Sequence, residues 1–130
     1  MGRELPPPLG SLALEVVCGH LDIVAARDKL GGGRNQELAL AAAIELAGRS
    51  PVVVLAAGTD GIDGLSDNAG AVVDPTTAGR LREAGIDPPA ALADNDSGSA
   101  LETIGDNIRI GPTGTNVCDV TLVLTAPTNQ

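Results

Sequence analysis

The chain has 130 residues, 43% of them hydrophobic and none aromatic, and it carries a formal net charge of −9 at pH 7. These values are typical of one globular domain whose core is packed from alanine, valine, leucine and isoleucine. The acidic charge argues against nucleic acid as a partner, because phosphate backbones need clustered lysine and arginine. The lack of aromatic rings disfavours sites built on base stacking, and no stretch is long and apolar enough to predict a membrane span.

The first thirty residues give the weakest structural signal. Residues 1–10 include three consecutive prolines and are typical of an exposed lead-in. Residues 11–29 place apolar side chains at helical spacing, but their β-branched residues also suit strands, and Gly19 interrupts either pattern. Of the two, we favour a helix. Glu15, inside the apolar stretch, makes this segment a poor signal peptide.

Beyond this lead-in, segments with helix and strand patterns alternate. After the glycine turn at 31–33, Asn35 is expected to cap an alanine- and leucine-rich helix over 35–47 that ends before Gly48. The patterns predict strands over 52–57, 71–73, 108–110 and 120–125, and further helical segments over 76–84, 88–93 and 97–104. This alternation predicts an α/β fold, namely a layered βα domain with a largely parallel or mixed sheet flanked by helices.

Cysteine and histidine are too few to predict a metal cluster. Cys18 and Cys118 lack zinc-type and CxxC spacing, and His20 stands alone. The pattern favours two reduced, buried thiols in a cytoplasmic protein, and it is also compatible with a disulfide between them.

The sequence GGGRNQE, residues 31–37, places a glycine turn directly before a helix. Helix N-termini present free N–H groups and a partial positive charge, so they attract phosphate or carboxylate. Arg34 adds a forked cation suited to the same anion. The simpler interpretation, which spacing alone favours, is a capped helix with a surface arginine.

A second polar segment follows the strand predicted over 52–57. The apolar run stops at Gly58 and gives way to a glycine-rich loop that carries Asp60, Asp63 and Asp67. Carboxylates at the end of a buried strand can hold Mg²⁺ near a nucleotide or accept a proton from a substrate hydroxyl. Asp-Gly pairs are equally common in ordinary turns, so spacing alone favours neither interpretation.

Two further loops are rich in small polar residues. The run Asp-Asn-Asp-Ser at 94–97 is typical of a helix cap and could also line a pocket. The run GPTGTN, residues 111–116, could cradle an anion with its backbone N–H groups and hydroxyls. It lacks the lysine of a Walker A motif, and the chain has neither a GxGxxG dinucleotide fingerprint nor a GxSxG nucleophile elbow.

Taken in order, these motifs resemble the MOFRL domain. This is the C-terminal domain of the glycerate 2-kinase family, some of whose members carry the label hydroxypyruvate reductase. The resemblance rests on four segments: GGRNQELAL (32–40), AGTDGIDG with the downstream AGA (57–71), NDS (95–97) and GPTGTNV.D (111–119). In combination, GPTGTN and GTDG with the downstream AGA are quite specific.

The resemblance implies a cytoplasmic enzyme that uses ATP and a divalent metal, Mg²⁺, to phosphorylate D-glycerate on its 2-hydroxyl, giving 2-phosphoglycerate. It implies that Asp60 and Asp63 are catalytic and either bind the metal or orient the hydroxyl. It further implies a set of loop residues that bind substrate or phosphate: Arg34, Asn35, Thr59, Asn95, Ser97, Thr113, Gly114, Thr115 and Asn116. The partners implied are glycerate, ATP and a Rossmann-like N-terminal domain, and a homo-oligomer is compatible with the sequence.

The chain departs from the family pattern in three ways. Leu65 and Ser66 stand where Pro-Thr is expected, residues 1–30 lack the strand expected there, and these 130 residues do not include the N-terminal domain. We therefore divide the chain into a divergent or truncated lead-in, residues 1–30, and a MOFRL-like domain, residues 31–130. The resemblance implies an active site between two domains, so we expect no kinase activity from this chain alone.

Two rival hypotheses come from other classes. The first is a stand-alone or vestigial module that binds an anion or small molecule without catalysis. The second is a reductase, as the family label suggests, and the missing dinucleotide fingerprint counts against it.

Overall fold

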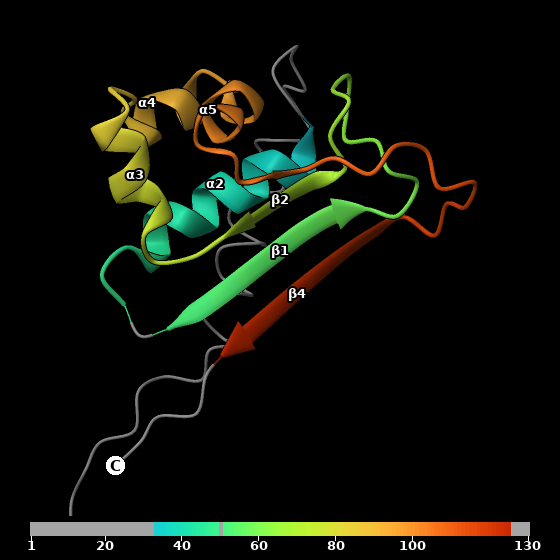
Figure 1. The fold of residues 1–130 in the computed structure, drawn as a ribbon, viewed down its shortest axis with the longest axis horizontal. Coiled ribbons are helices and arrows are strands. Elements are labelled where there is room, and N and C mark those ends of the chain that lie inside the picture. Colours follow the sequence, from blue (N-terminus) through green and yellow to red (C-terminus); the bar gives the residue numbers. More distant parts are fainter. Residues whose placement is uncertain (1–32, 50, 126–130) are drawn as a thin grey trace, which may run out of the picture.

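The structure is a computed structural model that describes residues 33–49 and 51–125 (Figure 1). The lead-in, the helix favoured over 11–29 and Cys18 lie outside these residues. The described helices and strands are α2 (Arg34–Leu46), β1 (Val52–Gly58), β2 (Gly70–Val73), α3 (Thr77–Glu83), α4 (Pro88–Ala93), α5 (Ser97–Ile104), β3 (Asn107–Ile108) and β4 (Asp119–Thr125). Each of them was predicted from the sequence, with bounds that agree to within two residues.

The strands form one sheet in the order β3-β2-β1-β4, and all three pairings are antiparallel. The expected sheet flanked by helices is confirmed, whereas the expected parallel pairing is not found among the described strands. Parallel neighbours need a crossover that returns the chain to the same end of the sheet. Here loops without helices join β1 to β2 and β3 to β4, and three successive helices between β2 and β3 return the chain in the opposite direction.

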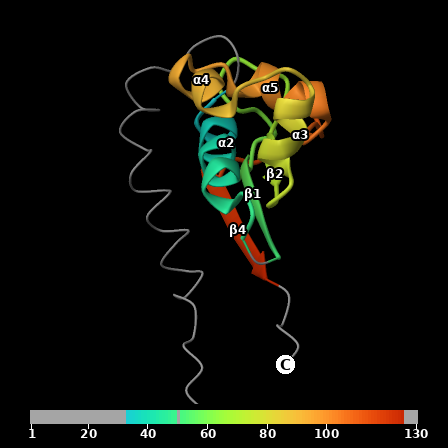
Figure 2. The same cartoon turned by 90° about the vertical axis from the view of Figure 1, so that its left-hand side faces the viewer.

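The core lies between α2 and one face of β1 and β2. Burial alternates along β1, so that Val52, Val54 and Ala56 face the core while the residues between them are half-buried. Leu40 and Leu46 of α2 pack against this face, and small alanine side chains let the helix backbone approach the sheet. Seen from the side, α2 runs alongside β1, and α3, α4 and α5 all contact α2 (Figure 2).

The helices cover only part of the sheet. Figure 1 shows them gathered on the β2 side, while β4 forms the opposite border. In the described part of the chain, no helix is long and apolar enough to span a bilayer.

The close pairing of β2 with β1 depends on a glycine. A Cβ atom at Gly70 would lie 1.8 Å from the carbonyl oxygen of Ala56 and 2.7 Å from the Cα atom of Ala57. We expect Gly70→Ala to lower the free energy of unfolding by about 3 kcal/mol or more, because the two strand backbones would have to separate. Urea unfolding followed by far-ultraviolet circular dichroism measures this change in a chain that has neither tryptophan nor tyrosine.

Gly79→Ala is the matched control. Gly79 lies within α3, and no atom lies within 4 Å of the position that its Cβ would take. Alanine there should raise the free energy of unfolding by about 0.5–1 kcal/mol through its higher helix propensity. Similar effects of the two substitutions would contradict the packing described for Gly70.

Candidate functional site

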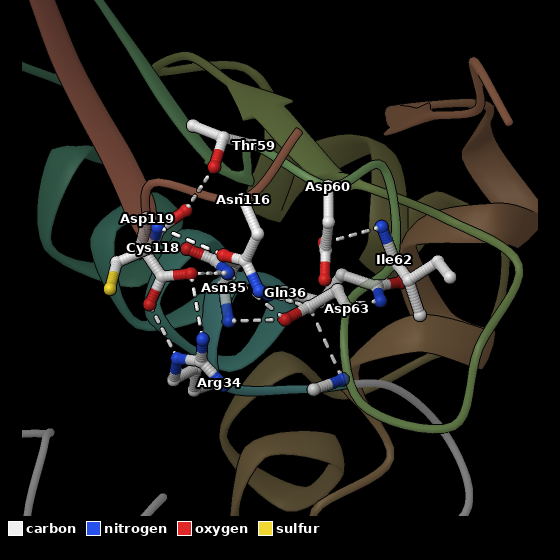
Figure 3. A network of polar contacts seen from close by, with 11 residues as sticks. Arg34, Asn35, Gln36, Thr59, Asp60, Ile62, Asp63, Asn116, Cys118 and Asp119 are labelled. Carbon is white, nitrogen blue, oxygen red and sulfur yellow. Dashed lines mark hydrogen bonds and ion pairs between the residues drawn. The ribbon is translucent and has the colours of Figure 1, made fainter. Parts of the chain in front are cut away.

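The first turn of α2 is organised around the carboxylate of Asp63 (Figure 3). Asp63 is fully buried. Its oxygens accept hydrogen bonds from the backbone N–H groups of Gly33, Asn35 and Gln36 at 3.2, 3.0 and 2.8 Å. The side-chain amides of Asn35 and Gln36 donate two more, at 3.1 and 3.0 Å. The carboxylate thus satisfies N–H groups that a helix leaves unpaired at its N-terminus, where negative charge is also favoured.

This arrangement corrects the cap expected from the sequence. The helix begins at Arg34 with Gly33 at the N-cap position, so Asn35 lies in the first turn and does not cap it. The capping carboxylate comes from a loop thirty residues further along the chain. A Cβ atom on Gly33 would lie 2.4 Å from Oδ1 of Asp63, so the glycine turn makes room for the carboxylate. The anion at this helix start is therefore the chain's own.

Arg34, in the same turn, binds Asp119, the first residue of β4. Nη2 of Arg34 donates to Oδ1 at 2.8 Å, Nε donates to Oδ2, and the amide of Asn35 donates to Oδ1 at 3.1 Å. Burial raises the pKa of the Asp119 carboxyl, but the hydrogen bonds from Arg34 and Asn35 and the charge of Arg34 outweigh burial, so the pKa lies below its ordinary value. These contacts tie the start of α2 to the start of β4.

Asp60 belongs to the same loop as Asp63 but has a different environment. It is half-buried, and its Oδ1 accepts a hydrogen bond from the N–H group of Ile62 at 3.0 Å. Within residues 33–49 and 51–125, no hydrogen bond to its Oδ2 is found. Its backbone carbonyl accepts a hydrogen bond from the N–H group of Thr113 at 3.1 Å. Of the two aspartates, Asp63 is buried and fully engaged, whereas Asp60 keeps a carboxylate oxygen that can meet a ligand.

The loop over 111–118 is fastened to the end of β1. The hydroxyl of Thr113 donates to the carbonyl oxygen of Thr59 at 2.6 Å, and the hydroxyl of Thr59 donates to the carbonyl oxygen of Cys118 at 2.7 Å. Oδ1 of Asn116 accepts a hydrogen bond from the N–H group of Cys118 at 3.0 Å. Figure 3 shows the side chains of Asp60 and Asn116 extending from the two loops toward the start of α2.

The start of α5 is held by a carboxylate from α2. Glu37 is 4% exposed, and its Oε1 accepts hydrogen bonds from the hydroxyl of Ser97 and from the Ser97 N–H group, the latter at 3.3 Å. Two residues earlier, Asn95 has a φ of 55° and is also 4% exposed. Its carboxamide oxygen is buried without a hydrogen-bond partner among the described residues. A buried acceptor of this kind is available to a ligand or a water molecule.

A buried amide network extends this region toward β3 and was not predicted. Nδ2 of Asn107 donates to Oε1 of Gln36 at 2.8 Å, and Nδ2 of Asn68 donates to the same oxygen at 3.4 Å. Gln36, Glu37 and Asp119 stand inside the motifs quoted above, and that is the signal that could have found them. Asn68 lies within the segment 57–71 but is not one of the letters that carry the resemblance, and Asn107 lies outside the motifs, so neither asparagine had a specific signal.

The predicted site residues fall into three connected groups. Arg34, Asn35 and Asp63 meet at the start of α2. Thr59, Asp60 and Thr113 meet at the end of β1, and Gly114, Thr115 and Asn116 follow in the same loop as Thr113, while Asn95 and Ser97 lie on the side of Glu37. No three side chains of His, Cys, Asp or Glu in the described ranges are placed to hold a metal ion. The expectation that Cys118 is buried is wrong: it is an exposed free thiol, because it lies in the surface loop before β4.

The chain matches a known protein family and several characterised relatives. The model of the MOFRL family matches residues 15–119. The chain is 53% identical over 109 residues to the D-glycerate 2-kinase of Thermotoga maritima, a match that covers 84% of this chain and 26% of that protein. It is 40% identical over 124 residues to the glycerate 2-kinase of Pyrococcus horikoshii, with 95% of this chain and 27% of that protein covered.

Solved structures give the same result. The crystal structure of glycerate kinase from Thermotoga maritima matches with a TM-score of 0.71 and 52% identity, over 73% of this chain and 23% of that chain. A structure from Pyrococcus horikoshii matches with a TM-score of 0.71 and 40% identity, over 75% and 22%. The chain therefore spans about a quarter of the length of these relatives. The family match begins inside the expected lead-in, and the boundary at residue 31 stays a prediction.

The cap formed by Asp63 can be tested by removing its charge. We expect Asp63→Asn to lower the free energy of unfolding by about 2–4 kcal/mol, because the new amide would direct N–H groups at buried donors and leave them unpaired. Asp67→Asn is the matched control, since Asp67 is exposed on the same loop, and it should change stability by less than about 0.5 kcal/mol. Equal losses in urea unfolding would contradict the capping role.

The pair formed by Arg34 and Asp119 predicts a pH dependence. A carboxyl whose pKa is lowered by folding adds stability above its unfolded pKa of about 3.9, and that stability is lost as the pH falls through the folded pKa. We therefore expect the stability difference between wild type and Asp119→Asn to be constant near neutrality and to shrink below about pH 4. The difference should be about 1 kcal/mol or less, because the pair is partly exposed. Thermal unfolding across this pH range measures it, and a difference that grows on acidification would contradict the assignment.

Proposed function

The chain belongs to the MOFRL family, and we propose that it forms the C-terminal domain of an ATP-dependent glycerate 2-kinase. Such an enzyme transfers the γ-phosphoryl group of ATP to the 2-hydroxyl of D-glycerate and releases 2-phosphoglycerate and ADP. The observation that carries the proposal is that two polar loops are joined through Thr113, Thr59 and Asp60 and that one of them caps α2 through Asp63, in a chain 53% identical to a D-glycerate 2-kinase. Because the chain spans about a quarter of that relative, glycerate and ATP are assigned to the whole enzyme.

Asp60 is the group we assign to the substrate hydroxyl. Phosphoryl transfer to an alcohol is assisted by a carboxylate that orients the hydroxyl and accepts its proton. Asp60 fits this role because it is half-buried, is fixed through Oδ1 by the N–H group of Ile62, and accepts no hydrogen bond at Oδ2 from the described residues. Its neighbours in the loops at 59 and 113–116 offer hydroxyl, amide and backbone groups for binding the substrate or a phosphate.

Asp63 takes a different role in this proposal from the one implied by the resemblance. A carboxylate that accepts five hydrogen bonds while fully buried has little capacity left for a metal ion or a proton. We therefore assign Asp63 as a positioning residue, which fixes the loop that presents Asp60. Arg34 and Asn35 likewise act by holding Asp119 and the two loops in register.

Within the described residues, the divalent metal that the resemblance implies fits one carboxylate, that of Asp60. Mg²⁺ at phosphoryl-transfer sites is commonly held by one or two carboxylates together with substrate phosphates and water. Among the described residues Asp60 suits such a role, and Asp63 does not, because its oxygens are already engaged. The metal, when bound, would neutralise phosphate charge. No step assigned to Asp60 or Asp63 here depends on it.

The charge of the site supports the view that it is half of an active site. Phosphoryl transfer depends on positioning and on neutralising several negative charges. At the start of α2, however, the positive charge of Arg34 faces Asp119, and the whole chain carries −9. The cations that bind ATP are therefore assigned to the rest of the enzyme, and we expect this chain alone to be inactive. A cytoplasmic location is part of the same proposal, since an exposed free thiol such as Cys118 persists in a reducing compartment.

A chimaera tests the proposed activity. We would replace the matching stretch of the Thermotoga maritima D-glycerate 2-kinase with residues 33–125 of this chain. We expect the chimaera to form 2-phosphoglycerate and ADP from D-glycerate and ATP, and Asp60→Asn within it to lower kcat by about a hundredfold or more. Coupled detection of ADP, with product identification by mass spectrometry, measures both.

The controls separate the proposal from its rivals. Asp87→Asn, at an exposed position before α4, should leave kcat within about twofold. A folded chimaera without kinase activity would overturn the kinase assignment. Glycerate or phosphate binding by the chain alone, unchanged by Asp60→Asn, would then favour the non-catalytic module, and oxidation of NAD(P)H with hydroxypyruvate would favour a reductase.

A further inference from the structure

The two edges of the sheet differ greatly in length. At one edge β3 has two residues, whereas β4 at the other edge has seven and pairs only with β1 among the described strands. Its pairing with β1 is continuous from Asp119 to Thr125, without a bulge. A long, regular edge strand presents a row of N–H and C=O groups that can pair with another strand.

The sequence of β4 lacks the features that usually block such pairing. Natural edge strands are protected by lysine, proline, bulges or inward-pointing charges. The sequence DVTLVLT contains none of these beyond Asp119 at its start, and that charge is bound by Arg34. Residues 120–125 are therefore neutral in a chain of net charge −9. Two acidic copies would repel each other least where their contact is formed by this uncharged strand.

The exposed apolar side chains of β4 all lie on one face. Val120, Leu122 and Leu124 are 41%, 50% and 65% exposed, and alternate residues of a strand share a face. In the register with β1 they stand opposite Ala57, Leu55 and Val53, so this face is apolar across both strands. The exposure of these three side chains shows that the described residues leave this apolar border of the sheet uncovered.

We propose that β4 pairs antiparallel with β4 of a second copy of this chain, with Leu122 opposite the partner's Leu122. In this register Val120 lies opposite the partner's Leu124, so all three cross-strand pairs on the exposed face are apolar. Asp119 lies opposite the partner's Thr125, and no two like charges face each other. A two-fold axis perpendicular to the sheet at Leu122 joins the four described strands of each copy into one continuous sheet, with both sets of described helices on the same side.

The first test measures the mass of the whole chain in solution. We expect a reversible dimer in sedimentation velocity, with a dissociation constant that falls as salt screens the repulsion between two acidic copies. Leu122→Lys should raise that constant about tenfold or more, because it replaces an apolar pair by two like charges directly opposite each other. Val72→Lys is the matched control, on the same face but in β2, and should leave the dimer intact.

The second test measures the register between the two β4 strands. It does not require the fold to tolerate a lysine substitution. In a background with Cys18→Ser and Cys118→Ser, Leu122→Cys should form a disulfide-linked dimer under mild oxidation, since directly opposed Cβ atoms lie about 4.5–5.5 Å apart. Thr121→Cys, one residue away and on the other face, should cross-link far less. Equal cross-linking of the two variants would overturn the register.

Other occupants of the edge would give different results. A chain that is monomeric at all concentrations overturns the proposal. If that monomer dimerises through Leu122 only after residues 1–32 are deleted, the edge is occupied by the chain's own N-terminal segment. A dimer disrupted by Val72→Lys and unaffected by Leu122→Lys would indicate that two sheets stack face to face, which also overturns edge pairing.

Discussion

The buried carboxylate of Asp63 is the interaction on which this part of the molecule depends. It accepts five hydrogen bonds from the first turn of α2 and the residue before it, so one side chain fixes where the principal core helix begins. Gln36, one of its donors, in turn accepts hydrogen bonds from the side-chain amides of Asn68 and Asn107. A charge at this depth is tolerable because every oxygen is hydrogen-bonded and the helix N-terminus favours it.

Local patterns were enough to predict the elements of the fold. The alanine-rich helix, the apolar run over 52–57 and the alternating VTLVLT each carry their own periodicity, and each is found where it was expected. Strand direction was not predictable in the same way, because it depends on how connections pass over the sheet. The role of Asp63 was also hidden: Asp60 and Asp63 both stand beside glycines in one loop, and only contacts with Gly33 and Gln36, far away in sequence, distinguish a buried cap from an accessible carboxylate.

The motifs of the resemblance therefore serve two purposes in the folded chain. GGRNQE, the aspartate at 63 and the aspartate at 119 build a rigid corner where a helix, a loop and an edge strand meet. Asp60 and Asn116 lie beside that corner, and Asp60 keeps a carboxylate oxygen for a ligand. Asn95, on the side of Glu37, keeps its buried carboxamide oxygen. A motif predicts that its residues lie in the same region. Which of them are structural and which can act on a ligand is decided by how buried each side chain is and by how many of its polar atoms are already hydrogen-bonded.

The two carboxylate-capped helix starts are arranged in series. Asp63 holds the start of α2, and Glu37 in the first turn of α2 holds the start of α5 through Ser97. The aspartate loop and the start of α5 are therefore both fixed to the same helical turn, which is itself packed against β1 and β2. The position of Asp60 relative to the Asn95 side of the region is set by that one turn.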